Sequence, residues 1–358
     1  MFPKGVCRCL QQTWVLWNTP LFFLRAEGGG WSLHGKRENC VKRCKSVTEI
    51  VTEAMRIVAE DRVSCLDEAD AEYFFRGESM NYHHRGDETA LLETDFPCYL
   101  YQNQGFIDHE RDLYQEALRY NVISFEQDKT MVDRLTRMQH YRLPTRFADI
   151  STNMFLAAFF AAGGERMTAR DRADDDGYIR IIKVAKHKMK SFTSDIIVAI
   201  AHLPLVKKED VHPGAKNGLE ALRYEITNER PGFSMSTRVG EEPSKWLEKV
   251  EADLRREIQQ VWAFKPILNN RRIRAQGGAF LAFGCGDEKA KLTPSFSPDD
   301  YNDETKPSYG IKQIGYVQIE AKSKPKVLED LRMFGMPAEN VYPDLADVCN
   351  EIAEHYRK

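Results

Sequence analysis

Several patterns that identify common protein classes are absent from the sequence. No Cys-x-x-Cys pair occurs among the eight cysteines, so we expect neither a disulfide framework nor a zinc site, and no other metal is assigned. No Gly-x-Ser-x-Gly elbow occurs, which argues against a serine hydrolase. The formal net charge of -3 requires no broad basic surface, so we expect no dedicated nucleic-acid binding.

Long hydrophobic runs are absent too. The apolar stretch Thr13–Leu24 is interrupted by Asn18 and Pro20, and it is shorter than the roughly 20 residues that a membrane-spanning helix needs. A signal peptide or anchor is the alternative reading, but no convincing cleavage site follows the stretch. We therefore expect a cytoplasmic protein that does not associate with membranes. Residues 1–44 are interpreted as an N-terminal extension that is either disordered or lies upstream of the native start.

The rest of the chain has the composition of a soluble globular protein, with 42% hydrophobic and 29% charged residues. Helical periodicity and capping residues predict helices over residues 47–59, 108–120, 129–140, 153–162, 244–261, 326–333 and 345–356. Alternating or short apolar runs predict strands over residues 71–76, 177–184, 196–201, 262–268, 278–283 and 314–320. Residues 207–243 are expected to form a long irregular stretch. The order of elements predicts a single α+β domain over residues 45–358, with a mixed, mainly antiparallel sheet flanked by helices.

The segment His140–Ala162 is the most informative part of the chain. Pro144 disfavours helix in the residue before it, so we expect the preceding helix to end near Tyr141 or Arg142 and the chain to run extended from Leu143 to Ile150. An almost wholly apolar helix then follows, and Gly163 ends it. A polar strand end that leads into a buried helix favours phosphate or carboxylate binding, because the first N–H groups lack partners within the helix.

Six side chains of this segment are candidates for a site: His140, Thr145, Arg146, Asp149, Ser151 and Thr152. Asp149, Ser151 and Thr152 are also good N-cap residues for the apolar helix. A structural interpretation is equally available. In it Arg146 and Asp149 form an ion pair, His140 is a satisfied core histidine, and the hydroxyl groups only cap the helix.

Arg76 closes an aromatic strand and precedes Gly77, which allows the chain to turn close to a neighbour. A buried guanidinium group needs a partner, because leaving it unpaired is unfavourable. That partner is either a carboxylate such as Asp149 or the phosphate of a ligand, which the planar guanidinium group can bind through two parallel hydrogen bonds.

These residues fall into motifs that resemble the FRG domain family. Residues 74–78 read FFRGE, and residues 140–149 read HYRLPTRFAD, which is similar to the HYGLPTRLLDW-type second motif of the family. Residues 271–280 and 341–345 resemble its third and closing elements. On these four elements, in order over about residues 45–356, the chain is identified as a member of the family. It departs from the pattern at Arg142, where glycine is usual.

A more distant similarity links this order of motifs to the ADP-ribosyltransferases, whose fold the domain would then share. The similarity implies an NAD-like ligand bound by Arg76, Gly77, Thr145, Arg146, Ser151, Thr152, Gln276 and Gly277. The catalytic glutamate of that superfamily is missing from the third element. A different reaction, such as NAD hydrolysis, would then use Glu78 as its base, or His140 oriented by Asp149.

The expected function is therefore binding of a small nucleotide or anion, with NAD as the best candidate for a substrate or ligand. FRG domain proteins resemble accessory genes of bacteria and phages, which suggests a role in a bacterial toxin or phage-defence system. The alternative is a non-catalytic binding or scaffold module, whose motifs only brace the fold.

Overall fold

The computed structural model describes residues 43–64, 70–80, 98–102, 104–120, 122–164, 175–206, 218–229, 253–254, 256–268, 271–276, 278–285 and 298–343. The chain divides into two compact units, Met1–Cys40 and Val41–Lys358, and all the described residues belong to the second. The boundary predicted after residue 44 stays a prediction.

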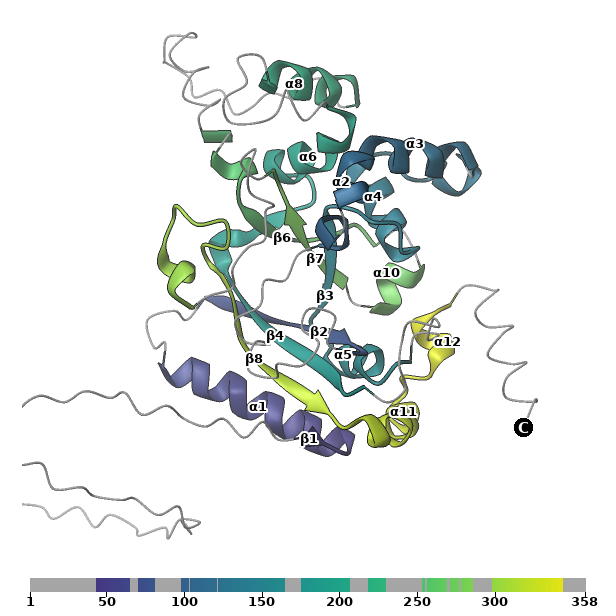
Figure 1. The fold of residues 1–358 in the computed structure, drawn as a ribbon, viewed down its shortest axis with the longest axis vertical. Coiled ribbons are helices and arrows are strands. Elements are labelled where there is room, and N and C mark those ends of the chain that lie inside the picture. The colour runs from purple at the N-terminus through teal and green to yellow at the C-terminus, as the bar shows by residue number, and fades with distance from the viewer. Residues whose placement is uncertain are drawn as a thin grey trace, which may run out of the picture. The chain divides into compact units, whose positions relative to one another are not determined.

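Eight strands form one sheet in the order β1-β8-β4-β2-β3-β7-β6-β5 (Figure 1). Their bounds, in chain order, are β1 (Arg43–Cys44), β2 (Ala71–Glu78), β3 (Phe147–Ser151), β4 (Gly177–Ala185), β5 (Met189–Ser191), β6 (Val261–Lys265), β7 (Gly278–Phe283) and β8 (Ile311–Ile319). The two outermost pairs, β1–β8 and β6–β5, are parallel, and the five inner pairs are antiparallel. The predicted α+β class with a mixed, mainly antiparallel sheet is confirmed.

The sheet consists of two half-sheets that meet at a single residue pair. β2 is in register with β4 along all eight of its residues, and β3 is in register with β7 along all five of its own. Between β2 and β3, only Phe75 and Ser151 are in register. The half-sheet β1-β8-β4-β2 and the half-sheet β3-β7-β6-β5 therefore diverge beyond this pair, and we name the opening the β2–β3 fork.

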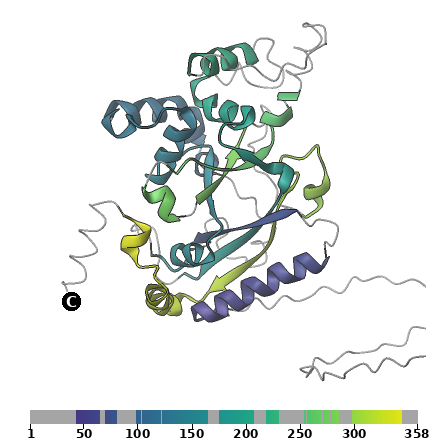
Figure 2. The ribbon, with the colours of Figure 1, turned by 180° about the vertical axis from the view of Figure 1, so that it is seen from behind.

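The described residues also form helices. They are α1 (Val47–Ser64), α2 (Gln104–Asp108), α3 (Glu110–Tyr120), α4 (Met131–His140), α5 (Met154–Ala161), α6 (Asp195–His202), α8 (Gly218–Glu229), α10 (Arg271–Gln276), α11 (Lys324–Met333) and α12 (Ala338–Val341). Short 3-10 turns are η2 (Tyr99–Gln102), η3 (Val122–Phe125), η4 (Lys186–Lys188), η5 (Leu203–Leu205), η6 (Pro298–Asn302) and η7 (Ala321–Ser323). From both sides, α1, α5 and α11 lie beside the first half-sheet, α4 and α6 lie beside the second, and α8 packs on α6 (Figures 1 and 2).

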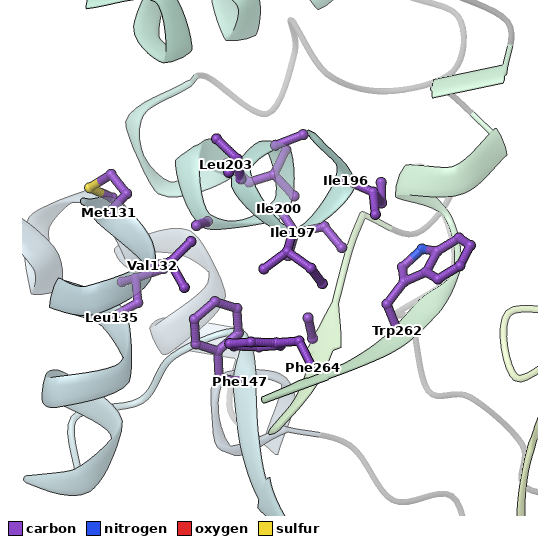
Figure 3. Close-up of a cluster of buried hydrophobic side chains, with 14 of the residues drawn as sticks. Met131, Val132, Leu135, Phe147, Ile196, Ile197, Ile200, Leu203, Trp262 and Phe264 are labelled. Atoms are coloured by element: carbon purple, nitrogen blue, oxygen red, sulfur yellow. The ribbon is translucent and has the colours of Figure 1, made fainter. Parts of the chain in front are cut away.

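Separate apolar clusters lie under these two groups of helices. The cluster of the second half-sheet joins α4 and α6 to Phe147 and Phe264, as Figure 3 shows. Another cluster joins α1, α5 and α11 to β4 and β8. A third cluster contains Phe74 and Ile150, one from each half-sheet, so it links them on the opposite face. Successive residues of a strand face opposite sides, which is why Phe74 and Phe75 pack in different clusters.

Most predicted elements are confirmed, and their ends show why they form. The predicted helix 47–59 is α1, which extends to Ser64. At its start, the N–H of Glu49 donates to Ser46 Oγ over 3.3 Å, and the N–H of Lys45 donates to Glu49 Oε2 over 2.9 Å. These bonds satisfy backbone donors of the kind that lack partners at a helix start. The predicted helix 345–356, and residues 244–252 of the predicted helix 244–261, lie outside the described residues.

Two predictions are wrong. Residues 196–201 were expected to form a strand, but they lie in helix α6, and every one of them is buried. A short run that is apolar on all sides has no periodicity to separate a buried helix from a buried strand. The stretch 207–243 was expected to be irregular, yet α8 occupies residues 218–229 within it.

The chain leaves α4 through a left-handed residue. The N–H of Arg142 donates to Gln139 O over 2.9 Å and the N–H of Leu143 donates to Met138 O over 3.0 Å, which is a Schellman motif. Arg142 has a φ of 65°. Glycine adopts this conformation without strain, and that explains why the resembled family usually carries glycine here. The motif turns the chain sharply from α4 toward β3.

Candidate functional site

Side chains satisfy the backbone groups of β3 that border the β2–β3 fork. Arg76 Nη1 donates to Asp149 O over 2.9 Å, and the N–H of Phe147 donates to Thr145 Oγ1 over 3.2 Å. Backbone polar groups that lose their ladder partners need substitutes, because leaving them unpaired in the interior is costly. Arg76 and Thr145 therefore supply hydrogen bonds that a neighbouring strand would otherwise give to β3.

A chain of hydrogen bonds continues from Thr145 to Asp149. Thr145 Oγ1 donates to Gln139 Oε1 over 2.8 Å, and Gln139 Nε2 donates to Asp149 Oδ2 over 3.0 Å. The Asp149 side chain is nevertheless 40% exposed. The network thus fixes the orientation of a carboxylate that solvent, or a ligand, can reach.

His140 lies behind that carboxylate. Its Nδ1 is 3.7 Å from Asp149 Oδ1, while only 3% of its side chain is exposed. The imidazole edge packs against Phe280 with 5.5 Å between ring centroids, and Phe280 is the register partner of Asp149 on β7. A ligand would therefore meet Asp149 first, and His140 would act through it.

Glu78 is enclosed between two arginines. Its Oε1 is 3.4 Å from Arg76 Nε, and its Oε2 accepts from Arg180 Nε over 3.0 Å. Arg180 Nη1 also donates to Gln313 Oε1 over 2.8 Å. Glu78 is 4% exposed and Arg180 is fully buried, so the pair is an internal brace of β2 and β4. Burial between two guanidinium groups does not suit the role of general base predicted for Glu78.

Arg146 lies on the other face of the sheet from Asp149. Its Nη1 donates to Tyr101 OH over 2.9 Å and to Gly284 O over 2.7 Å, and its Nη2 donates to Glu110 Oε2 over 2.6 Å. Burial alone would lower the pKa of Arg146, but the Glu110 carboxylate raises that pKa well above its usual value. An ion pair was one interpretation of Arg146, with Asp149 as the partner, and the structure gives it Glu110 instead. We therefore leave Arg146 out of the candidate site.

The polar residues that follow β3 are used mainly within the fold. Asn153 caps α5, since its Oδ1 accepts from the N–H groups of Phe155 and Leu156 over 3.0 and 3.4 Å. The cap expected at Asp149, Ser151 or Thr152 is thus corrected to Asn153, and two of the N–H groups expected to bind an anion are occupied. Thr152 is exposed.

Ser151 and Gln276 connect three elements. Ser151 Oγ donates to Gln276 O over 3.0 Å and accepts from the N–H of Asn153 over 3.0 Å. Gln276 Nε2 donates to Val341 O over 3.4 Å. Both side chains are buried, at 5% and 6% exposure, so they fix β3 to α10 and α12 rather than face a ligand.

The glycines of the motifs differ in their surroundings. A Cβ on Gly77 would lie 1.9 Å from Ala157 O, so this glycine is what allows α5 to rest directly on β2. Among the described residues, a Cβ on Gly278 would meet no atom within 4 Å. Gly278 is the register partner of Ser151, which in turn pairs with Phe75. Gly277 lies outside the described residues.

The structure thus brings the motifs together in three adjacent strands. The convergence expected from the sequence places Arg76, Asp149 and Gly278 around the β2–β3 fork. Gln139, which orients Asp149, was missed, because nothing in its sequence context points to a residue ten positions away. Asn153 was also missed, although a cap residue directly before an apolar run was a usable signal.

Two features of other protein classes are absent from the described residues. No helix among them is both long and apolar enough to cross a bilayer. No group of three or more His, Cys, Asp or Glu side chains within that part of the chain is placed to hold a metal ion.

Comparison with known proteins finds a family match for one part of the chain. Neither a curated protein nor a solved structure matches this chain. The family model of the FRG domain matches residues 71–170, which begin with β2, run past α5, and include both Arg76 and Asp149. The chain therefore carries an FRG domain, and the two strands that border the fork belong to it.

Proposed function

We propose that the β2–β3 fork binds a nucleotide, with NAD as the first candidate. One observation carries this proposal. The half-exposed Asp149 carboxylate is held in place by Gln139, and Arg76 is anchored on the carbonyl of the same residue. Carboxylates accept hydrogen bonds from ribose hydroxyl groups, and guanidinium groups bind phosphate. Strand alternation assigns the two side chains to opposite faces of the sheet, but Arg76 Nη1 reaches the edge of β3 at the Asp149 carbonyl, so a ribose phosphate that enters the fork would contact both groups.

Each residue has a defined role in this proposal. Asp149 accepts from the ribose hydroxyl groups, and His140 supports the carboxylate from behind. A phosphate would bind Arg76 by joining or replacing its bonds to Glu78 and to the Asp149 carbonyl. Thr145, which is buried, and Gln139, which is partly buried, position Asp149 without touching the ligand.

Hydrolysis is the reaction that this residue set would favour with NAD. Water would attack C1′ of the nicotinamide ribose, the C1′–N bond would break, and nicotinamide would leave with the bonding electrons. The proton of the water would pass through Asp149 to solvent, which yields ADP-ribose, nicotinamide and one proton. Transfer of ADP-ribose to a macromolecule is disfavoured, because the third motif has Gln276 where the ADP-ribosyltransferases have a glutamate. A part in bacterial toxin or phage-defence systems would fit such an NAD-consuming activity.

The test is calorimetric titration of the full chain with NAD, followed by an assay of nicotinamide release. We expect wild-type protein to bind NAD and Arg76→Ala to bind at least about 10-fold more weakly, since a charge-assisted hydrogen bond contributes roughly 1.5–3 kcal/mol. Arg119→Ala is the matched control, because Arg119 is an exposed arginine on α3. Absence of NAD binding by wild-type protein would overturn the proposal.

A specific observation also supports a non-catalytic scaffold. Every residue of the Phe-Arg-Gly motif has a packing role: Phe75 joins an apolar cluster, Arg76 replaces a strand contact, and Gly77 accommodates α5. The Arg76→Ala variant separates the two functions. Lost NAD binding at an unchanged melting temperature supports a site, whereas a melting temperature several degrees lower, with no binding by the wild type, supports a brace.

A further inference from the structure

The open space at Gly278 lies on the same side of the sheet as the Asp149 carboxylate. Residues two apart in a strand share a face, and so do cross-strand partners. Gly278 shares its face with Phe280, whose ring contacts His140, and it is paired with Ser151, two residues beyond Asp149. No atom of the described residues lies within 4 Å of the position that a Cβ on Gly278 would occupy. A ligand held at Asp149 therefore has unfilled room beside it, over the start of β7.

An exposed aromatic ring stands at the end of α4, directly after His140. Tyr141 is 55% exposed. The guanidinium carbon of Arg272, on α10, lies 5.8 Å from the Tyr141 ring centroid and 4.5 Å from that of Tyr342. Arg272 is only 8% exposed. Two rings and a buried cation thus connect the end of α4 to α10, the helix that leads toward Gly278.

The geometry points to a subsite for a planar aromatic ring, formed by the open space over Gly278 with Tyr141 as its stacking surface. This inference rests on the proposed function and specifies its ligand: a nucleotide whose base or nicotinamide ring stacks on Tyr141 while its ribose reaches Asp149. Aromatic side chains stack on any base, because every base has a π-face. Arg272 holds the Tyr141 side of the subsite by its contact with the ring.

Two substitutions test the subsite from opposite directions. Gly278→Val adds volume where no atom of the described part of the chain interferes, and valine favours a strand, so the melting temperature should hold or rise. NAD affinity should nevertheless fall at least about 10-fold, because the added methyl groups occupy the space of the ring. Gly278→Ala should give a smaller loss.

Removal of the stacking surface should have a related effect. Tyr141→Ala should lower NAD affinity roughly 10- to 100-fold, and Tyr141→Trp should retain it within about 3-fold, since stacking needs a ring but no hydroxyl group. Tyr120→Ala is the matched control, because Tyr120 is an exposed tyrosine on α3 that also packs against an arginine, Arg119. The control should bind NAD like the wild type.

The outcomes separate this inference from the proposed function. The subsite is supported if Gly278→Val and Tyr141→Ala bind NAD more weakly at an unchanged melting temperature, while Tyr141→Trp retains NAD affinity. Wild-type affinity in both Gly278→Val and Tyr141→Ala overturns the subsite and leaves the proposed function standing. A wild-type protein that binds no NAD overturns both.

Discussion

Replacing Arg146 with methionine tests whether the second motif supplies a ligand-binding arginine or a buried brace. In the structure this guanidinium group makes three hydrogen bonds, to Tyr101, to the Gly284 carbonyl and to Glu110. The Arg146 and Glu110 side chains are 5% and 9% exposed. Methionine has a similar length but no charge, so the substitution leaves the Glu110 carboxylate buried without its partner.

The expected loss follows from that burial. Removing one partner of a buried ion pair lowers the free energy of unfolding by about 3–5 kcal/mol, because the remaining charge is uncompensated. The double variant Arg146→Met with Glu110→Gln should recover part of this loss, by roughly 1–2 kcal/mol, because the lone charge is gone. A deficit should remain, since the Tyr101 hydroxyl and the Gly284 carbonyl still lack their donor.

Chemical denaturation followed by circular dichroism measures these free energies. Arg119→Met is the control, because the Arg119–Glu116 pair is 63% and 53% exposed and such pairs contribute about 1 kcal/mol or less. A loss below about 1 kcal/mol for Arg146→Met, together with abolished NAD binding, would refute the structural reasoning and return Arg146 to the site.

Three further predictions concern single positions. Gly77→Ala should lower the free energy of unfolding by about 1–3 kcal/mol or more, because the new Cβ would meet the Ala157 carbonyl at 1.9 Å; denaturation midpoints will show this, and an unchanged midpoint would contradict it. Arg142→Gly should be neutral or stabilising by up to about 1 kcal/mol, since glycine relieves the φ of 65° at some expense in chain entropy, whereas Arg142→Val should destabilise in the same assay. Burial lowers the pKa of Lys188 from its usual 10.5 to about 7, so the unfolded state binds more protons between those pH values and stability should rise with pH across that window. Denaturation from pH 6 to 10 should show a rise of at most about 1.4 kcal/mol per pH unit in wild-type protein relative to Lys188→Met, and parallel pH profiles would contradict it.

Local patterns predicted most of the sheet. The consecutive aromatic residues Tyr73, Phe74 and Phe75 identify β2, because aromatic residues favour strands, and its two faces pack in different apolar clusters. The bend at Pro144 and the apolar run after Asn153 likewise predict β3 and α5. These features are determined by neighbours in the sequence, which is why a single sequence suffices for them.

Features that depend on distant partners were not predictable. Ile196–Ala201 is apolar on every side, so its sequence does not separate a helix from a strand. The segment forms a helix in the structure, where it packs in the same apolar cluster as α4. Glu110 lies 36 residues before Arg146, and no local signal pairs the two. The sequence placed Arg146 and Asp149 in one motif, but strand alternation puts their side chains on opposite faces.

The convergence of the site was predictable in outline only. Motif order placed Arg76, Asp149 and the glycines near one another, and strand register agrees. The hydrogen-bond network of the structure was needed to tell which groups remain available to a ligand. Ser151 and Gln276 proved to be internal, while Asp149 stays exposed.

The most direct test of the account is the NAD affinity of Asp149→Asn relative to wild type, measured by calorimetry on the full chain. Asparagine keeps the size of the side chain and one oxygen for Gln139, but it removes the charge that would hold the ribose. The account predicts NAD binding by the wild type and a loss of roughly 10- to 100-fold in Asp149→Asn, with no loss in the exposed control Asp112→Asn. Equal affinities in all three proteins would contradict it.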